Sequence, residues 1–274
     1  MSRSQPDHST STSDRDRLRL TFGTDAERYD RVRPGYPEQL FDDLAEMACI
    51  GPRCRVLEIG VGTALATIPL VQRGCLLVGV ELSPELAAIA ERRLEAFANA
   101  SVVVSAFEDW PLPVEPFDAV VSATAFHWID PAVRVTKAAD ALRPDGALAT
   151  IATHHVAGGS GEFFDEVQAC YELWDPPTPE GLRLPRAEDI ASSSEEIDGS
   201  GRFGQAIFRR YEWEVAYSTT EYRDLLLSYS GHIDLEPASQ DGLLACIAEL
   251  IDSRYGGQIT KRYLTELRVA HRHR

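Results

Sequence analysis

Two glutamates and two glycines stand at positions where they can hold a small ligand. Glu58 lies in an apolar run at residues 55–59, and Gly60 and Gly62 follow that run directly. Glycine accepts positive φ and has no side chain, so the backbone of this turn can approach a ligand closely. Glu81 ends the next apolar run, 21 residues after Gly60, where a carboxylate can accept both hydroxyls of a ribose. A ligand with an ammonium group gains from a carboxylate at Glu58, whereas a pyrophosphate does not.

The glycine turn alone fits several ligand classes, among them dinucleotides, flavins and S-adenosylmethionine (SAM). A dinucleotide fingerprint asks for a third glycine where this chain has Leu65. The plainer alternative is that Glu58 and Glu81 are solvated acids at strand ends. Their joint spacing around the turn favours a ligand with a cationic end and a ribose.

Short apolar runs alternate with helical lengths up to residue 153. The expected strands are residues 55–59, 76–80, 102–105, 119–122 and 147–153. The expected helices are residues 37–48, 63–72 with a kink at Pro69, 84–97 capped by Ser83, and 131–142, which a turn at 143–146 follows. Strands that are apolar on both faces and separated by helices predict an α/β fold, a Rossmann-like doubly wound sheet that is mostly parallel.

The pattern changes after the fifth expected strand. The sequence predicts a helix at 162–173, a loop or flap at 175–204, a strand at 207–217, helices at 220–229 and 243–254, and a final strand at 258–270. The two late strands would complete the sheet, the last one antiparallel, and the helices would form a cap. The carboxyl ends of the parallel strands should meet at one ligand crevice.

Composition narrows the class of protein. The net charge of −16 disfavours nucleic acid as a partner, and no apolar run is long enough to predict a membrane span. The Ser/Thr-rich start has no apolar segment of the kind found in a secretory signal. The five cysteines form no C-x-x-C pair, so we expect free thiols in a reducing cytoplasm. No metal site is expected, because carboxylates at metal-ligand spacing are missing beside the histidines.

Four segments taken together resemble class I SAM-dependent methyltransferases. They are the glycine turn at 58–64, the acidic strand end at 81–83, the run 106–109 and the strand 117–122. The segments 26–37 and 122–128 are similar to a bacterial small-molecule subgroup that includes trans-aconitate methyltransferase-like enzymes. One departure is Ala64, where the family usually has a third glycine.

The resemblance implies a role for each matching residue toward SAM. Gly60 and Gly62, with Thr63 and Ala64, would receive the methionyl part, and Glu58 would order the turn. Further cofactor contacts are implied for Glu81 at the ribose, Leu82, Ala106, Phe107 and Glu108 at the adenine, Ser122 and His127 near the methionyl end, and Tyr29 and Arg33 over the methionine carboxylate. For Tyr29, a packing role in a leading helix is an equal alternative.

Composition and the order of the elements, together with the resemblance, predict a domain plan. It comprises a disordered tail at 1–17, a helical segment at 18–48 that closes over the cofactor, a SAM-binding core at 49–160, a cap at 161–256 and a final strand with a tail at 257–274.

Methyl transfer depends mainly on aligning the acceptor with the methyl group, and it needs a base only if the acceptor loses a proton. His127 is the first candidate base, and a structural role beside Trp128 is slightly favoured over it. His154 is a second candidate, at the end of the fifth expected strand.

The resulting hypothesis is a cytoplasmic SAM-dependent methyltransferase that acts on an O, N or C atom of a small molecule, in keeping with secondary metabolism. It would be a monomer or homodimer, without nucleic acid or membrane partners. The alternatives are a NAD-dependent oxidoreductase and a non-catalytic SAM-binding subunit.

Overall fold

The computed structural model describes residues 18, 19, 23 and 25–274, so the expected tail at 1–17 lies outside the described residues. The chain divides into two compact units. Unit 1 contains the described residues up to Pro34 together with His154–Ala191 and Glu212–Leu264. Unit 2 contains Gly35–Thr153, Ser192–Tyr211 and Thr265–Arg274.

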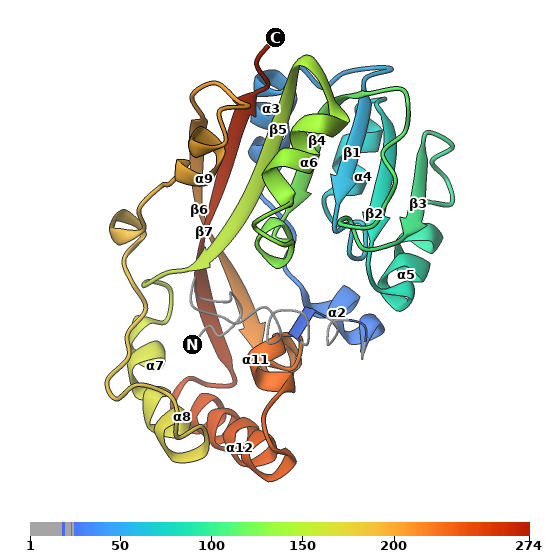
Figure 1. Ribbon diagram of the computed structural model, residues 1–274. Coiled ribbons are helices and arrows are strands. Elements are labelled where there is room, and N and C mark those ends of the chain that lie inside the picture. Colours follow the sequence, from blue (N-terminus) through green and yellow to red (C-terminus); the bar gives the residue numbers. More distant parts are fainter. Residues whose placement is uncertain (1–17, 20–22, 24) are drawn as a thin grey trace. The chain divides into compact units, whose positions relative to one another are not determined.

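The described residues form a seven-stranded sheet in the order β3-β2-β1-β4-β5-β7-β6 (Figure 1). The strands are β1 (Arg55–Ile59), β2 (Leu76–Glu81), β3 (Ala100–Val104), β4 (Phe117–Ala123), β5 (Leu142–His155), β6 (Ile207–Ser218) and β7 (Gln258–His271). The pairs β1–β2, β1–β4, β2–β3 and β4–β5 are parallel, and the last strand runs antiparallel. The predicted α/β sheet is therefore confirmed.

Successive residues of the central strands alternate between two apolar layers of unit 2. Val56 packs in one layer with α3 (Glu38–Met47), α4 (Thr67–Gln72) and α5 (Pro84–Leu94). Leu57 packs in the other layer with α6 (Arg134–Ala141) and α9 (Glu195–Gly199). Both faces of the sheet are thus covered, which explains why β1 is apolar apart from Arg55 at its start and Glu58.

The helix expected at 63–72 is shorter than predicted. It begins at Thr67, because Ala64 has a φ of 68° and the chain turns once more before the helix starts. Pro69 then falls in the first turn, where a missing N–H costs no helical hydrogen bond, so the expected kink has no basis. The start of α5 agrees with prediction, since the side chain of Ser83 accepts from the N–H of Leu86 and Pro84 is the first helical residue.

The turn expected at 143–146 lies inside β5 and forms a bulge. Phe117 pairs with Leu142 and Ala119 with Ala147, so three extra residues stand on the β5 side between these two pairs. Asp145 takes a φ of 61°, the conformation that its residue type tolerates best after glycine and asparagine. The residue types predicted a chain reversal, but these residues form a bulge and β5 continues beyond them.

Unit 1 is mainly helical around one apolar cluster that contains Phe163, Tyr222 and Ile247. Its helices are α2 (Ala26–Val32), α7 (Gly161–Glu166), α8 (Gln168–Trp174), α10 (Thr219–Leu226), α11 (Ser230–Ile233) and α12 (Pro237–Arg254). The single helix expected at 162–173 is divided into α7 and α8, and the one expected at 220–229 ends early, at Leu226. The expected loop at 175–204 contains the 3-10 turn Ala187–Asp189 and α9.

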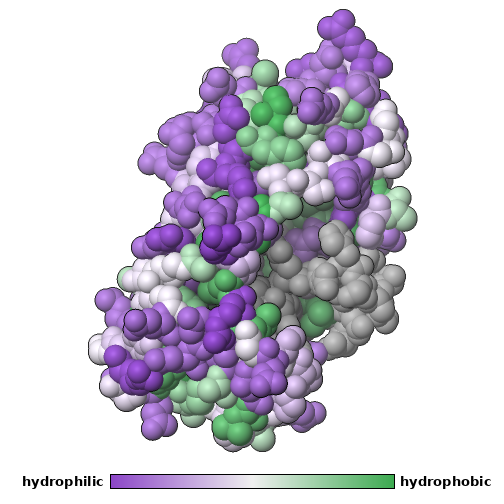
Figure 2. All heavy atoms as spheres, turned by 90° about the vertical axis from the view of Figure 1, so that its left-hand side faces the viewer, coloured by the Kyte–Doolittle hydropathy of each residue, from purple (hydrophilic) through white to green (hydrophobic). Residues whose placement is uncertain are grey.

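The face over α7, α8 and α9 is mostly hydrophilic, with small separate hydrophobic patches (Figure 2). In the part of the chain that the structure describes, no helix combines the length and apolar character that crossing a membrane requires.

The expectation of free thiols is wrong for two cysteines. Cys170 of α8 and Cys246 of α12 form a disulfide, with their Cα atoms 5.8 Å apart. The residues are separated by 76 positions in the sequence, and the packing of two helices brings them together. Cys49, Cys54 and Cys75 are free. The cysteine pattern therefore no longer supports a reducing compartment, and the cytoplasmic location stays a prediction.

Removing the disulfide should destabilise the chain. For Cys170→Ser we expect a loss of roughly 2–5 kcal/mol in the free energy of unfolding, because the bond restricts a long loop of the unfolded chain. Urea unfolding under non-reducing conditions measures it, with Cys49→Ser, an exposed free thiol, as control. Equal midpoints for both variants would contradict the prediction, as would a wild-type midpoint insensitive to dithiothreitol.

Candidate functional site

The turn after β1 uses positive φ at three alternate residues. Gly60 has a φ of 72°, Gly62 of 58° and Ala64 of 68°. A Cβ on Gly60 would lie 2.4 Å from the Cβ of Ala125, so this glycine is required by close packing. A Cβ on Gly62 would meet nothing within 4 Å, so this glycine leaves backbone open to a ligand. Ala64 departs from the family pattern and holds the strained conformation while fully buried.

Glu81 ties the end of β2 to the glycine turn. One carboxylate oxygen accepts from the N–H of Gly62 at 2.8 Å, and the other accepts from the N–H of Ser83 at 2.9 Å. The side chain is buried, and burial raises its pKa above the ordinary value for glutamate. The carboxylate predicted to hold the ribose therefore also fixes the shape of the turn. Its remaining lone pairs can accept further hydrogen bonds.

Glu58 is almost completely enclosed beneath the turn, at 1% exposure. Burial raises its pKa to about 8, and the nearby charge of Glu81 adds to this shift. Within the described residues, neither Oε2 of Glu58 nor the hydroxyl of buried Thr63 has a hydrogen-bond partner. Such buried, unmatched polar atoms are costly, and a polar ligand at the turn would relieve that cost.

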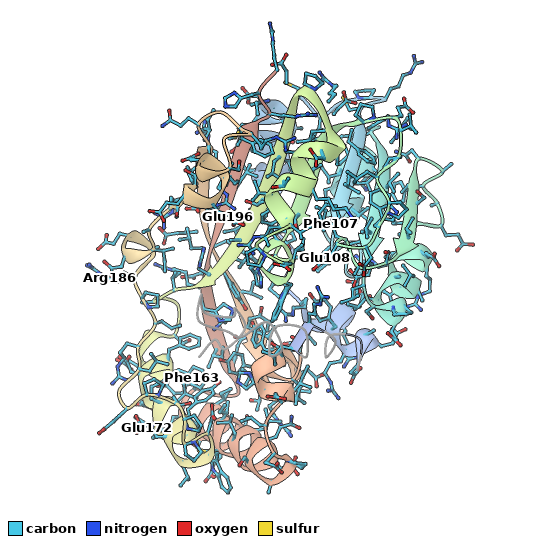
Figure 3. The ribbon with its side chains drawn as sticks, in the orientation of Figure 1. Phe107, Glu108, Phe163, Glu172, Arg186 and Glu196 are labelled. Carbon is cyan, nitrogen blue, oxygen red and sulfur yellow. A yellow bond between two sulfur atoms is a disulfide. The ribbon has the colours of Figure 1, made fainter. Side chains whose placement is uncertain are left out.

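The predicted adenine-binding residues follow β3. The N–H of Ser105 donates to the carbonyl of Glu81 at 2.9 Å, which joins this loop to the end of β2. Phe107 is buried and Glu108 is half-buried, and both lie in the loop after β3 (Figure 3). Lys137 donates to the carbonyl of Glu108 at 2.7 Å, and its ammonium lies 5.3 Å from the centre of the Phe107 ring. The side chain of Glu108 accepts from the N–H of Asp130 at 3.2 Å.

Ser122 and His127 lie at the end of β4 and just beyond it. The hydroxyl of Ser122 donates to the carbonyl of Ile59 at 2.9 Å, so it links β4 to β1 while fully buried. His127 lies in the 3-10 turn Phe126–Trp128, and its ring centre is 5.0 Å from that of Trp128. This contact matches the structural role favoured for His127, and a catalytic role is not tested by it.

The residues predicted to bind the cofactor fall into the two units. The larger group lies in unit 2, at the ends of β1, β2, β3 and β4: Glu58, Gly60, Gly62, Thr63, Ala64, Glu81, Leu82, Ala106, Phe107, Glu108, Ser122 and His127. Tyr29, Arg33 and His154 belong to unit 1. There the guanidinium of Arg33 lies 4.7 Å from the centre of the Tyr29 ring. The roles of Tyr29 and Arg33 toward the cofactor, and of His154 as a candidate base, remain predictions.

Two residues of this region escaped the sequence analysis. Lys137 supports the loop after β3 from α6, and no motif surrounds it in the sequence. Ala125 packs against Gly60, and only its place in the run of small residues at 122–125 could have pointed to it. Among the described residues, no three His, Cys, Asp or Glu side chains gather as a metal site would require.

The two glycines of the turn should respond differently to alanine. Gly60→Ala combines strained φ with the clash at Ala125, and we expect a loss of about 2–5 kcal/mol in unfolding free energy. Gly62→Ala has only the strained φ, which costs about 1–2 kcal/mol. Denaturant unfolding of the matched pair measures both values. Equal losses would show that the approach to Ala125 does not constrain the turn.

Glu58 should make stability fall as pH rises. Its pKa of about 8 in the folded chain exceeds the ordinary value of 4.5, so between these values the folded state holds a proton that the unfolded state has lost. The resulting loss is at most about 1.4 kcal/mol per pH unit. Glu58→Gln should remove this component and be more stable than wild type at pH 8. The exposed Glu95→Gln is the control, and unfolding curves with the same pH slope in wild type and Glu58→Gln would refute the assignment.

Comparisons with known proteins agree with this geometry. Residues 56–146 match the family described as methyltransferase domain. An uncharacterised methyltransferase of Mycobacterium tuberculosis is 35% identical over 140 residues, which cover 51% of this chain and 55% of the relative. The chain thus spans about half the length of this curated relative.

Solved structures show the same fold at low identity. The phosphoethanolamine N-methyltransferase 2 of Haemonchus contortus, solved with SAM, is 20% identical with a TM-score of 0.54, over 98% of this chain and 61% of that one. The YcgJ protein of Bacillus subtilis is 15% identical with a TM-score of 0.53, over 87% of this chain and all of that one. The segment that carries the glycine turn therefore matches a methyltransferase domain, and the sheet around it has a Rossmann-like methyltransferase fold.

Proposed function

We propose that this chain is a SAM-dependent methyltransferase that transfers a methyl group to an O, N or C atom of a small molecule. The observation that carries the proposal is the open backbone at Gly62, with the buried carboxylates of Glu58 and Glu81 on either side. The match of residues 56–146 to a methyltransferase domain supports it.

The residues of the turn fit SAM in charge and shape. No protein atom lies within 4 Å of the position that a Cβ on Gly62 would take, so this space is open to the ligand. Glu58 and Thr63 offer buried polar atoms without partners among the described residues. SAM carries an ammonium and a sulfonium charge. These charges would lower the raised pKa values of Glu58 and Glu81 and favour their carboxylate forms.

Five of the predicted cofactor residues in unit 2 have the following proposed roles. Glu81 accepts the ribose hydroxyls while it holds the turn through Gly62. Leu82 and Phe107 give apolar surface to the adenine, and the carboxylate of Glu108 accepts from its amino group. Ser122, whose hydroxyl is engaged by Ile59, shapes the methionyl end through its backbone.

When bound, SAM supplies a methyl group that a sulfonium centre already activates. The chain then has to hold the acceptor in line with that methyl group and exclude water. His127 would take a proton from the acceptor only if the acceptor atom is protonated. His154 is the second candidate for that task. Retained turnover in His127→Ala would assign it a structural role.

Two alternatives differ in what the chain binds and transfers. A NAD-dependent oxidoreductase would bind NADH, and Leu65 in place of the third fingerprint glycine disfavours it. A non-catalytic SAM-binding subunit would bind SAM without turnover. Incubation with methyl-labelled SAM and a panel of small acceptors separates it from an enzyme.

SAM affinity should depend on Glu81. For Glu81→Ala we expect the dissociation constant to rise at least about tenfold, because hydrogen bonds to a buried carboxylate are lost. Calorimetry measures the dissociation constants of SAM and of NADH, with exposed Glu95→Ala as the matched control. Circular dichroism checks that the variant is folded. Unchanged SAM affinity in folded Glu81→Ala would remove the ribose assignment, and tighter binding of NADH than SAM would overturn the proposed function.

A further inference from the structure

A hollow of about 650 Å³ lies beside the disulfide of unit 1. The helices α8 and α12 pack together there (Figure 1), and Cys170 and Cys246 both line the hollow. Cys170 is only 4% exposed, whereas Cys246 is half-buried. A small molecule in the hollow therefore meets the disulfide from the side of Cys246.

One side of α12 forms a wall of the hollow. At spacings of three and four residues, it contributes Cys246, Glu249, Leu250, Ser253 and Arg254. Glu249 follows Cys246 by three positions, so the Cβ atoms of the two residues are neighbours on the helix surface, about 5–6 Å apart. A small group bonded to the sulfur of Cys246 is thus within reach of the Glu249 carboxylate.

The charged side chains around the hollow leave an excess of negative charge. Two ion pairs lie in its lining, Arg183 with Asp165 at 2.9 Å and Arg254 with Glu166 at 2.7 Å. The lining also contains the carboxylates of Glu172 and Glu249, and neither forms an ion pair within the described part of the chain. The hollow therefore attracts a small cation and repels a small anion.

Gln168 adds an unmatched hydrogen-bond acceptor to the lining. It is 3% exposed and belongs to the residues around the hollow. Its Nε2 donates to the carbonyl of Phe164 at 3.1 Å, and its Oε1 has no partner among the described residues. A buried carbonyl oxygen without a donor is costly, so the hollow favours a ligand that brings N–H groups.

We propose that this hollow is a site where a small thiol with an ammonium group exchanges with the disulfide and becomes attached to Cys246. The hollow supplies the space, Cys246 the sulfur that is attacked, and Glu249 the partner for the ammonium group. The site lies within unit 1 and stands whether or not the chain transfers methyl groups.

The exchange needs no added oxidant or reductant. The incoming thiol loses its proton to water, and its thiolate sulfur forms a bond to Sγ of Cys246. The bond between the two cysteines breaks, and the sulfur of Cys170 leaves as a thiolate that takes a proton from water. One disulfide is consumed and one is formed. The exchange also frees α8 from its covalent link to α12.

The test uses the full chain without SAM. Its free thiols are first blocked with iodoacetamide, a small thiol is added, and newly released thiols are trapped with N-ethylmaleimide. The probes are cysteamine, which is cationic, and 2-mercaptoethanesulfonate, which is anionic. The rate of each thiol is divided by its rate on hydroxyethyl disulfide, a neutral reference, so that the ratio of the two reports attraction to the protein.

At low ionic strength we expect cysteamine to react at least about fivefold faster than the sulfonate. Glu249→Gln should lower this ratio about threefold, because it removes the charge next to Cys246. The matched control is Glu95→Gln, which removes the same charge from an exposed position of unit 2 and should leave the ratio within about 1.5-fold. Circular dichroism checks that both variants are folded. Peptide mass spectrometry should find the aminothiol on Cys246 and N-ethylmaleimide on Cys170.

Three results would overturn the inference. They are no exchange in the folded chain, attachment of the aminothiol to Cys170, and a ratio that falls no further in Glu249→Gln than in Glu95→Gln. The last result would show that the overall charge of −16, and not the hollow, selects the cation. None of these results bears on SAM binding, so this inference and the proposed function can fail separately.

Discussion

The carboxylate of Glu81 connects three elements that would otherwise end independently. Its two oxygens accept from the N–H of Gly62 after β1 and the N–H of Ser83 before α5. A buried carboxylate is stable only when such donors replace water, so the strand end, the glycine turn and the helix start must form together. The open backbone at Gly62 exists because this bond holds it in place. The shape of the candidate site therefore depends on the end of β2, the turn after β1 and the start of α5 being formed together.

Residue types predicted most of the sheet, since runs such as 55–59 and 76–80 are mostly apolar, short and separated by helical lengths. The errors have different physical causes. Ala64 takes a positive φ, which alanine permits only occasionally, so the late start of α4 left no clear trace in the sequence. At 143–146 the turn-forming residue types were visible, but they form a bulge inside β5 instead of a chain reversal. The pairing of Cys170 with Cys246 depends on how two helices pack, which spacing does not reveal.

The residues of the candidate site were easier to predict from the sequence than the residues that hold its loops in place. Glu58, Gly62 and Glu81 stand at strand ends, and the parallel topology alone brings such ends to one edge of the sheet. Lys137 reaches its loop from the middle of a helix, and a lysine there reads as an ordinary solvated residue. Lys261 is hidden in the opposite way. It lies in the first half of β7, where burial alternates over residues 258–263, and only the three-dimensional packing shows that its amine lies beside aromatic rings.

The disulfide between α8 and α12 also changes the connectivity of the chain. It closes a covalent ring that includes every residue from Tyr171 to Ala245, and the loop-rich stretch at 175–204 is part of that ring. A protease that cuts once in this stretch opens the ring without releasing a fragment. The nicked molecule keeps its mass apart from one added water, and its two pieces separate only after reduction. Cleavage there would therefore escape notice on a non-reducing gel.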